Sequence, residues 1–146
     1  MKVLAKAIVE HHRDDTTSTL YGLIARRLYR EEAPSKKSDK GIATITSEYP
    51  YIVYRIVDDI PFEIMWEHQG EQLRIQFDIW SNKNGAGQAE DVYDALKEKY
   101  DNCQNQLTVT GYTCVKFKRD VARLVKDQES GLWRYMVDFI VILSKE

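Results

Sequence analysis

The stretch "QLRIQFDIWSNKNGAGQAEDVYDALKEKY" (72–100) contains residue types and spacing that could hold a phosphate. A strand-like run passes through Gly85 and Gly87 into a helix-like run, which is the order found in nucleotide-binding proteins. A Rossmann turn needs a third glycine where this chain has Glu90, and the Gly-Lys-Ser/Thr of a P-loop is missing. The carboxylates of Glu90 and Asp91 would also repel a phosphate at the helix start. We therefore interpret the glycines as allowing a sharp connection between strand and helix, and we expect no cofactor.

The segment from His11 to Asp15 offers possible metal ligands, because imidazole and carboxylate groups both bind divalent ions. The candidates are His11, His12, Asp14 and Asp15. Neighbouring histidines on a flexible segment rarely point at one ion, and the third histidine, His68, falls in a predicted turn or strand end. We interpret these residues as solvated loop residues and expect no metal.

The sequence shows no pattern of catalytic groups. No Ser, Cys or Lys has the neighbours of an activated nucleophile. Asp58 and Asp59 are an adjacent pair in a predicted turn, whereas a glycosidase needs two carboxylates facing each other across a cleft. Cys103 and Cys114 form neither a Cys-x-x-Cys pair nor a zinc pattern, and we expect them to be small core residues. We predict that the protein is not an enzyme.

Charge is segregated in two segments. The first is acidic and has no Lys or Arg, with Asp58, Asp59, Glu63, Glu67 and Glu71. The second is basic apart from Asp120, with Lys116, Lys118, Arg119, Arg123 and Lys126. Two interpretations remain open: solvated sheet faces, or complementary patches that bind each other. The interleaved basic and aromatic residues at 113–126 also allow a third, a strip that binds nucleic acid.

Hydrophobic spacing predicts the order helix, three strands, helix, two strands. A weak helical signal in the first dozen residues precedes it. The predicted elements are a helix at 20–30, strands at 49–57, 62–68 and 73–79, a helix at 89–100, and strands at 107–125 and 133–143. Asp58, Asp59 and Pro61 are expected to form a turn between the first two strands, and Gly111 a bulge in the fourth.

The strand pattern predicts the fold class. Leu73, Ile75, Phe77 and Ile79 alternate with polar residues, which indicates a sheet with one buried face. Only the connection that contains the second long helix could form a crossover. We therefore expect an α+β fold, with a mainly antiparallel sheet and two to three helices packed on one face.

Length and composition bound the organisation of the chain. The 146 residues, 43% hydrophobic and 30% charged with a net charge of −2, predict a single domain over 1–146. Within it we expect a variable N-terminal segment at 1–18 and a flexible loop at 31–48. No signal peptide and no apolar run long enough to span a bilayer is evident, so we expect a cytoplasmic protein with no membrane partner.

Several short motifs occur in an order that resembles a known family. They are "LYGLIARRLYREEAP" (20–34), "YPYIVYRIV" (49–57), "LRIQFDIWS" (73–81), "AEDVYDALKEKYDN" (89–102) and "LWRYMVDFIVIL" (132–143). Together they resemble the tail-completion proteins of phages and prophages, the tail terminators of long-tailed phages. The resemblance covers about residues 20–143.

This resemblance implies a structural role. Such proteins assemble as a ring, usually a hexamer, on the finished tail tube. The ring stops tube polymerisation and presents a surface to the head connector, and DNA passes through its lumen. The implied partners are further copies of the chain, the tail tube protein and the head–tail connector protein. The implied locations are the host cytoplasm during assembly and then the virion tail.

A head-to-tail ring needs two different surfaces that match. The acidic segment from Asp58 to Glu71 and the basic segment from Lys116 to Lys126 are candidates for such a pair. Alternatively, the acidic segment lines the lumen, where it would keep DNA from sticking. Two other functions stay open: another ring of the head–tail neck, such as a stopper or adaptor, or a small nucleic-acid-binding module using 113–126.

Overall fold

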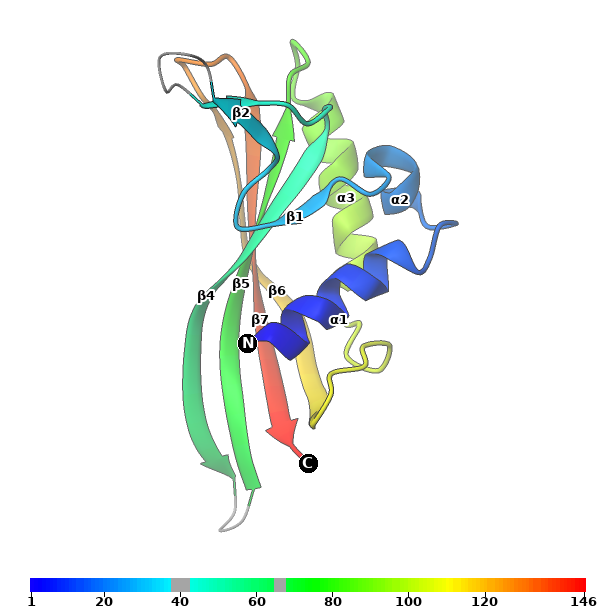
Figure 1. The fold of residues 1–146 in the computed structure, drawn as a ribbon, viewed down its shortest axis with the longest axis vertical. Coiled ribbons are helices and arrows are strands. Elements are labelled where there is room, and N and C mark those ends of the chain that lie inside the picture. Colours follow the sequence, from blue (N-terminus) through cyan, green and yellow to red (C-terminus); the bar gives the residue numbers. More distant parts are fainter. Residues whose placement is uncertain (38–42, 65–67) are drawn as a thin grey trace.

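The computed structural model describes residues 1–37, 43–64 and 68–146. Figure 1 shows long strands that form one layer and helices that form a second layer on one side of it. The elements are α1 (Lys2–Arg13), α2 (Thr19–Ile24), β1 (Leu28–Arg30), β2 (Ser35–Lys37), β3 (Ala43–Ile45), β4 (Tyr51–Ile64), β5 (His68–Ser81), α3 (Gly87–Tyr100), β6 (Tyr112–Lys126) and β7 (Trp133–Lys145).

The described residues form a five-stranded sheet in the order β1-β4-β5-β7-β6. Strand β1 runs parallel to β4, and the other neighbours in this sheet are antiparallel. Strands β2 and β3 pair separately within the segment 31–48, of which residues 38–42 lie outside the described residues. The prediction of an α+β fold with a mainly antiparallel sheet and helices on one face is confirmed (Figure 1).

Alternation of apolar residues builds the buried face of the sheet. Leu73, Ile75, Phe77 and Ile79 of β5 are at most 1% exposed. Their neighbours on β7 include Val137 and Phe139, which are 0% exposed. Helix α3 covers this face with Val92, Leu96 and Tyr100, which are spaced along one side of the helix and are also fully buried.

Helix α1 belongs to the same core. Leu4 and Ile8 are 0% exposed, so the weak helical signal at the N-terminus corresponds to a complete, packed helix. Two buried tyrosine hydroxyls bind its backbone. Tyr54 of β4 donates to the carbonyl of Ala5 (3.1 Å), and Tyr100 of α3 donates to the carbonyl of Ile8 (2.7 Å).

The predicted helix at 20–30 is wrong in its second half. Helix α2, which Ser18 caps by accepting from the N–H of Tyr21, ends at Ile24, and Ala25 has a positive φ of 51°. The chain then forms β1, because the Arg27 carbonyl accepts from the N–H of Ile52 (3.0 Å) and Leu28 is buried beside β4. Long-range pairing therefore outweighs the local helical pattern.

The predicted turn at Asp58, Asp59 and Pro61 is also wrong. Strand β4 continues to Ile64, and a register shift between Ile56 and Asp58 marks a β-bulge. Strand β1 pairs with Ile52–Tyr54, and beyond Tyr54 this edge of β4 has no strand partner among the described residues. An edge strand can accommodate Pro61, which has no N–H to donate. The strands expected at 49–57 and 62–68 largely form one strand, β4, which begins at Tyr51 rather than Tyr49. Residues 65–67 lie outside the described residues, and His68 begins β5.

The predicted strand at 107–125 begins later than expected. Strand β6 starts at Tyr112, and Gly111 precedes it with a left-handed φ of +83°. Register shifts instead lie between Cys114 and Lys116 and between Arg119 and Val121. No helix in the described ranges is long and apolar enough to cross a membrane.

Replacing Tyr100 with Phe should destabilise the fold, because the variant loses the buried hydrogen bond to Ile8. We expect the free energy of unfolding to fall by about 1 kcal/mol, measured by urea denaturation. Tyr112→Phe is the control, since the half-buried Tyr112 hydroxyl makes no hydrogen bond within the described part of the chain. Equal losses in both variants would contradict this role for Tyr100.

Candidate assembly surface

The glycine loop between β5 and α3 is held by Ser81. The Ser81 hydroxyl donates to the Gln88 side chain (2.6 Å) and accepts from the N–H of Lys83 (3.3 Å). Neither Gly85 nor Gly87 has a positive φ, and a Cβ added at either would meet no described atom within 4 Å. The loop is thus a connection closed by side-chain contacts, and its geometry does not require glycine.

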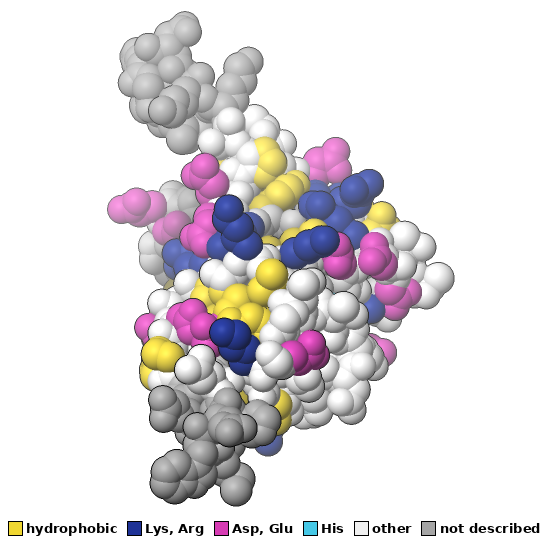
Figure 2. Space-filling view, turned by 60° about the horizontal axis from the view of Figure 1, so that its bottom comes forward, with side chains coloured by type: hydrophobic (Ala, Val, Ile, Leu, Met, Phe, Trp, Pro, Cys, Tyr) yellow, Lys and Arg dark blue, Asp and Glu magenta, His cyan; other side chains and the backbone are white. Residues whose placement is uncertain are grey.

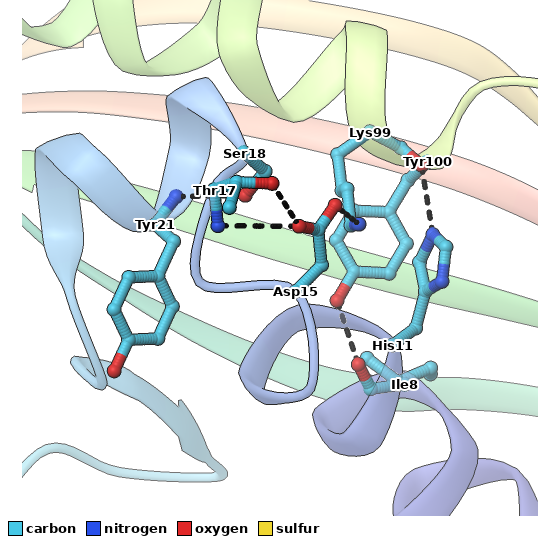
Figure 3. Close-up of polar contacts among 8 residues, drawn as sticks. All are labelled: Ile8, His11, Asp15, Thr17, Ser18, Tyr21, Lys99 and Tyr100. Carbon is cyan, nitrogen blue, oxygen red and sulfur yellow. Dashed lines mark hydrogen bonds and ion pairs between the residues drawn. The ribbon is translucent and has the colours of Figure 1, made fainter.

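The interpretation as solvated loop residues is wrong for His11 and His12, which lie in the last turn of α1, whereas Asp14 and Asp15 follow the helix and Asp14 is exposed. The Nε2 of His11 donates to the Lys99 carbonyl (3.0 Å), and that of His12 donates to the Ala25 carbonyl (2.5 Å). Asp15 accepts from Thr17 and from the Lys99 ammonium (2.9 Å), as Figure 3 shows. These contacts connect α1 to α2 and α3. The described residues contain no group of three or more ligand side chains that could hold a metal.

Both cysteines are free and buried, as predicted. Cys103 is 2% exposed and Cys114 is 6% exposed. Burial, with a smaller contribution from Cys114, raises the pKa of Cys103 to about 12. Burial likewise raises the pKa of Cys114 to about 11. Both thiols therefore stay protonated at neutral pH and act as small apolar side chains.

The face of the sheet opposite the helices carries an ion-pair network that crosses the strands. Asp78 of β5 is only 1% exposed, and it accepts from Arg134 of β7 (2.8 Å) and lies 3.5 Å from Arg55 of β4. Arg74 of β5 similarly joins Asp120 of β6 (2.8 Å) and Asp138 of β7 (3.4 Å). The alternation in β5 placed Arg74 and Asp78 on this face, but their partners depend on strand register, which the sequence does not reveal.

Apolar side chains lie on this same face between the charges, beyond the part where Ala33, Tyr51 and Val53 form a small buried cluster. Ile60, Val121 and Val125 are 55%, 51% and 39% exposed, respectively. Ile140 and Ile142 of β7 are half-buried beside them. Figure 2, which views the molecule from another side, shows that exposed hydrophobic side chains lie among acidic and basic ones there too. Mixed apolar and charged surfaces of this kind suit protein–protein contacts.

The acidic segment lies on the β4–β5 hairpin. Asp58 and Asp59 are exposed on β4, beyond the part that β1 covers. Glu71 of β5 is half-buried, and burial, followed by the nearby Asp59 carboxylate, raises its pKa. Glu67 lies outside the described residues, as does the side chain of Glu63.

The basic segment is strand β6, which forms the opposite edge of the sheet. Lys116, Lys118 and Arg123 are exposed, and the exposed Lys126 lies 5.6 Å from the centre of the Trp133 ring. Arg119 instead turns toward the helices. Its side chain donates to the Tyr93 hydroxyl, and its N–H donates to Asp101 (3.1 Å). Asp58 and Asp59 therefore lie on the stretch of β4 that β1 does not pair with, away from the basic residues on the edge strand β6, whereas Glu71 lies on the inner strand β5.

A family model described as "Tail completion protein gp17" matches residues 6–144. The chain belongs to the tail completion protein gp17 family. It is thus a structural protein of the viral tail, and the resemblance read from the motifs is confirmed. The matched range includes most of α1, which the motifs themselves did not reach.

The tail completion protein is also similar in structure to a chain of a solved particle, "Virion of native gene transfer agent (GTA) particle". The TM-score is 0.72 at 13% sequence identity, and the match covers 97% of this chain and 94% of that chain. At this identity the likeness shows a shared fold. No curated protein sequence matches the chain.

Replacing Asp78 with Ala should destabilise the tail completion protein, because it leaves Arg134 and Arg55 without their buried carboxylate. We expect a loss of about 1–3 kcal/mol in the free energy of unfolding, measured by chemical denaturation. The control Asp120→Ala breaks the ion pair with Arg74, whose two side chains are about a third exposed. The loss in the free energy of unfolding should then stay below about 1 kcal/mol. A smaller loss at Asp78 than at Asp120 would refute the structural role of the buried carboxylate.

The free energy of unfolding should decrease as the pH falls below 6.5, the ordinary pKa of a histidine side chain. Burial lowers the pKa of His11 and of His12 in the folded chain, so the unfolded chain takes up protons first. The neutral histidines contribute fully to the free energy of unfolding above the pKa of histidine in the unfolded chain. Their contribution decreases as the pH falls below that pKa. Urea unfolding at pH about 7.5 and about 5.5 measures the change. Replacing both histidines with Gln should flatten the dependence, and an unchanged dependence would contradict this origin.

Proposed function

We propose that this tail completion protein assembles as a closed ring of identical copies, a hexamer, that caps the tail tube. The ring ends tube polymerisation and joins the tail to the head connector, after assembly in the host cytoplasm. Membership of the family and the shared fold with a chain of a gene transfer agent virion support this proposal. The role is structural, and it requires matching surfaces with no catalytic residue or cofactor.

The observation that carries the proposal is the separation of opposite charges at the two edges of one sheet. Asp58 and Asp59 lie on the free part of β4, whereas Lys116 and Lys118 lie on β6. A head-to-tail ring needs two different surfaces on each copy, one matching the other. Free strand edges also present unpaired N–H and C=O groups that can bind another chain. An acidic edge facing a basic edge satisfies these requirements.

Rival placements lead to different observations. An acidic segment on the lumen would repel DNA, so reversing its charge would make assembled rings retain DNA at low salt. A stopper or adaptor ring would bind the connector protein and leave growing tubes uncapped. The exposed Lys116, Lys118 and Arg123 also keep the nucleic-acid-binding alternative open. In that case the monomer would bind DNA with an affinity that falls steeply with salt.

Electron microscopy of the concentrated protein, alone and mixed with purified tail tubes, tests the proposed function. We expect closed rings, and an added ring at one end of each tube. Tubes growing from purified tube protein should stop elongating once the tail completion protein is added. Particles that neither form rings nor bind tube ends would contradict the proposal, and binding to connector protein alone would favour another neck ring.

Reversing the acidic edge with Asp58→Lys and Asp59→Lys should weaken the association of copies about tenfold or more, because like charges would then face each other. The defect should shrink as salt screens the repulsion. Sedimentation velocity at several salt concentrations measures both effects. Glu129→Lys, in the exposed turn before β7, is the control for a charge change elsewhere. Equal association of all three proteins would exclude this edge from the interface.

A further inference from the structure

The exposed side of helix α3 is acidic. Glu90, Asp91, Asp94 and Glu98 are exposed, and Lys97 neutralises part of this charge through its contact with Asp94 (3.4 Å). The other basic residue of the helix, Lys99, turns inward to Asp15. We call these four exposed carboxylates the α3 acidic face.

Aromatic side chains border the α3 acidic face on the side of β6 and β7. The Tyr93 ring stacks on Tyr135 at 4.2 Å with an interplanar angle of 15°, and the Arg119 side chain of β6 binds the Tyr93 hydroxyl. Burial, then the Tyr93 hydroxyl, then the carboxylates of Glu90 and Asp94 raise the pKa of Tyr135. Glu90 and Asp94 are neighbours of Tyr93 on the helix, and Lys97 and Arg119 lie over the Tyr93 ring at 5.2 and 5.7 Å. The acidic face therefore borders a partly apolar surface that also carries two cations.

A basic groove lies between helix α1 and strand β1. Its hollow of about 510 Å³ is lined by Lys2, Lys6, Arg13, Arg26 and Arg30, with only Glu10 and Asp14 as acidic residues. A second hollow of similar size continues along β1, and Val9, Arg13 and Arg30 line both. The Nε of Arg13 is buried without a hydrogen-bond partner in the described part of the chain. We call this surface the α1–β1 groove.

The α1–β1 groove and the stacked rings that border the α3 acidic face lie toward opposite edges of the sheet, whereas Glu98, at the far end of that face, lies beside α2. Helix α1 packs on β4 through the Tyr54 hydroxyl, next to β1 at one edge of the sheet. Helix α3 packs on β5, β7 and β6, and its Tyr93 contacts Arg119 of the β6 edge. Side-by-side copies in one orientation would therefore bring the α3 acidic face of one copy to the α1–β1 groove of the next.

We propose that these two surfaces dock between neighbouring copies, the α3 acidic face of one in the α1–β1 groove of the next. The inference rests on the proposed ring and names the interface of its helical layer. In the sheet layer the β4 edge is acidic and the β6 edge basic, and in the helical layer the signs are exchanged. One lateral contact then pairs opposite charges in both layers, while an inverted or shifted copy brings like charges together. A second copy in the same orientation is thus the occupant that this pattern fits.

Reversing the charge of the groove separates assembly from folding. Lys2 is the first residue of α1, and the first turn of this helix has no acidic residue. A glutamate at this position would interact favourably with the positive end of the helix dipole. Lys6 forms a pair with Glu10 (3.6 Å), and the loss of this solvent-exposed pair should lower the stability only slightly. The variant Lys2→Glu with Lys6→Glu should therefore unfold only slightly below the wild-type temperature. Its copies should associate about tenfold or more weakly by sedimentation velocity, because the groove would then repel Glu90 and Asp94.

The reciprocal variant, Glu90→Lys with Asp94→Lys, should show the same loss of association. A chain carrying all four substitutions should regain association to within about threefold of wild type, since every contact is then inverted but complementary. Glu129→Lys serves as the control and should associate like the wild type. If the paired variants associate normally, or if the fourfold variant stays as weak as either pair, the docking inference is wrong while the ring itself stands. If the wild-type chain neither self-associates nor binds tail tubes, the proposed function fails, and the docking inference with it.

Discussion

The hydroxyl and ring of Tyr100 join all the layers of this fold. The residue ends helix α3, its ring packs against Phe77 of β5 and Phe117 of β6, and its hydroxyl donates to the Ile8 carbonyl of α1. Because these groups satisfy one another inside the protein, both long helices are fixed to the same face of the sheet. On the opposite face a small second cluster buries Ala33, Tyr51 and Val53. The rest of that face, the part of β4 that β1 does not pair with and the outer edge of β6 are available for contacts with other molecules. The assembly role proposed for this tail completion protein depends on that one-sided burial.

The charges on the uncovered face have two different roles. Asp78 and Arg74 are neutralised by partners on neighbouring strands, so they tie β4 to β7 together and contribute little net charge. The charges at the edges, such as Asp58 on β4 and Lys118 on β6, form no ion pair among the residues that the structure describes. The ion pairs in the centre of the sheet cancel one another, whereas acidic residues on β4 and basic residues on β6 remain unpaired by this network. Each copy would therefore be negative at one edge of the sheet and positive at the other. That polarity favours one orientation of neighbours, as a closed ring requires.

Sequence patterns predicted the parts of the fold that depend on local alternation. The apolar alternation at 73–79 and 133–143 predicted two central strands and the single buried face, and the spacing at 89–100 predicted α3. Local patterns could not predict that the chain leaves helix α2 at Ile24, because that change depends on pairing with β4, more than twenty residues away. The continuation of β4 past Asp58 likewise depends on β5 and on a bulge.

Only part of the candidate surfaces could be predicted from the sequence. Composition alone located the acidic and basic segments, but it could not show that Arg119 turns inward to Tyr93. The α1–β1 groove combines Lys2 and Lys6 with Arg26 and Arg30, which are separated in the sequence by the turn after α1 and by helix α2. No local motif marks such a surface, because tertiary packing creates it.

The length of tails made without this protein tests the central claim most directly. Particles from a producing strain that lacks the protein can be compared with the wild type by electron microscopy. If the protein caps the tube, the tails should vary widely in length, with many longer than wild type, and should be detached from heads. Tails of normal, uniform length joined to heads would contradict the proposed role.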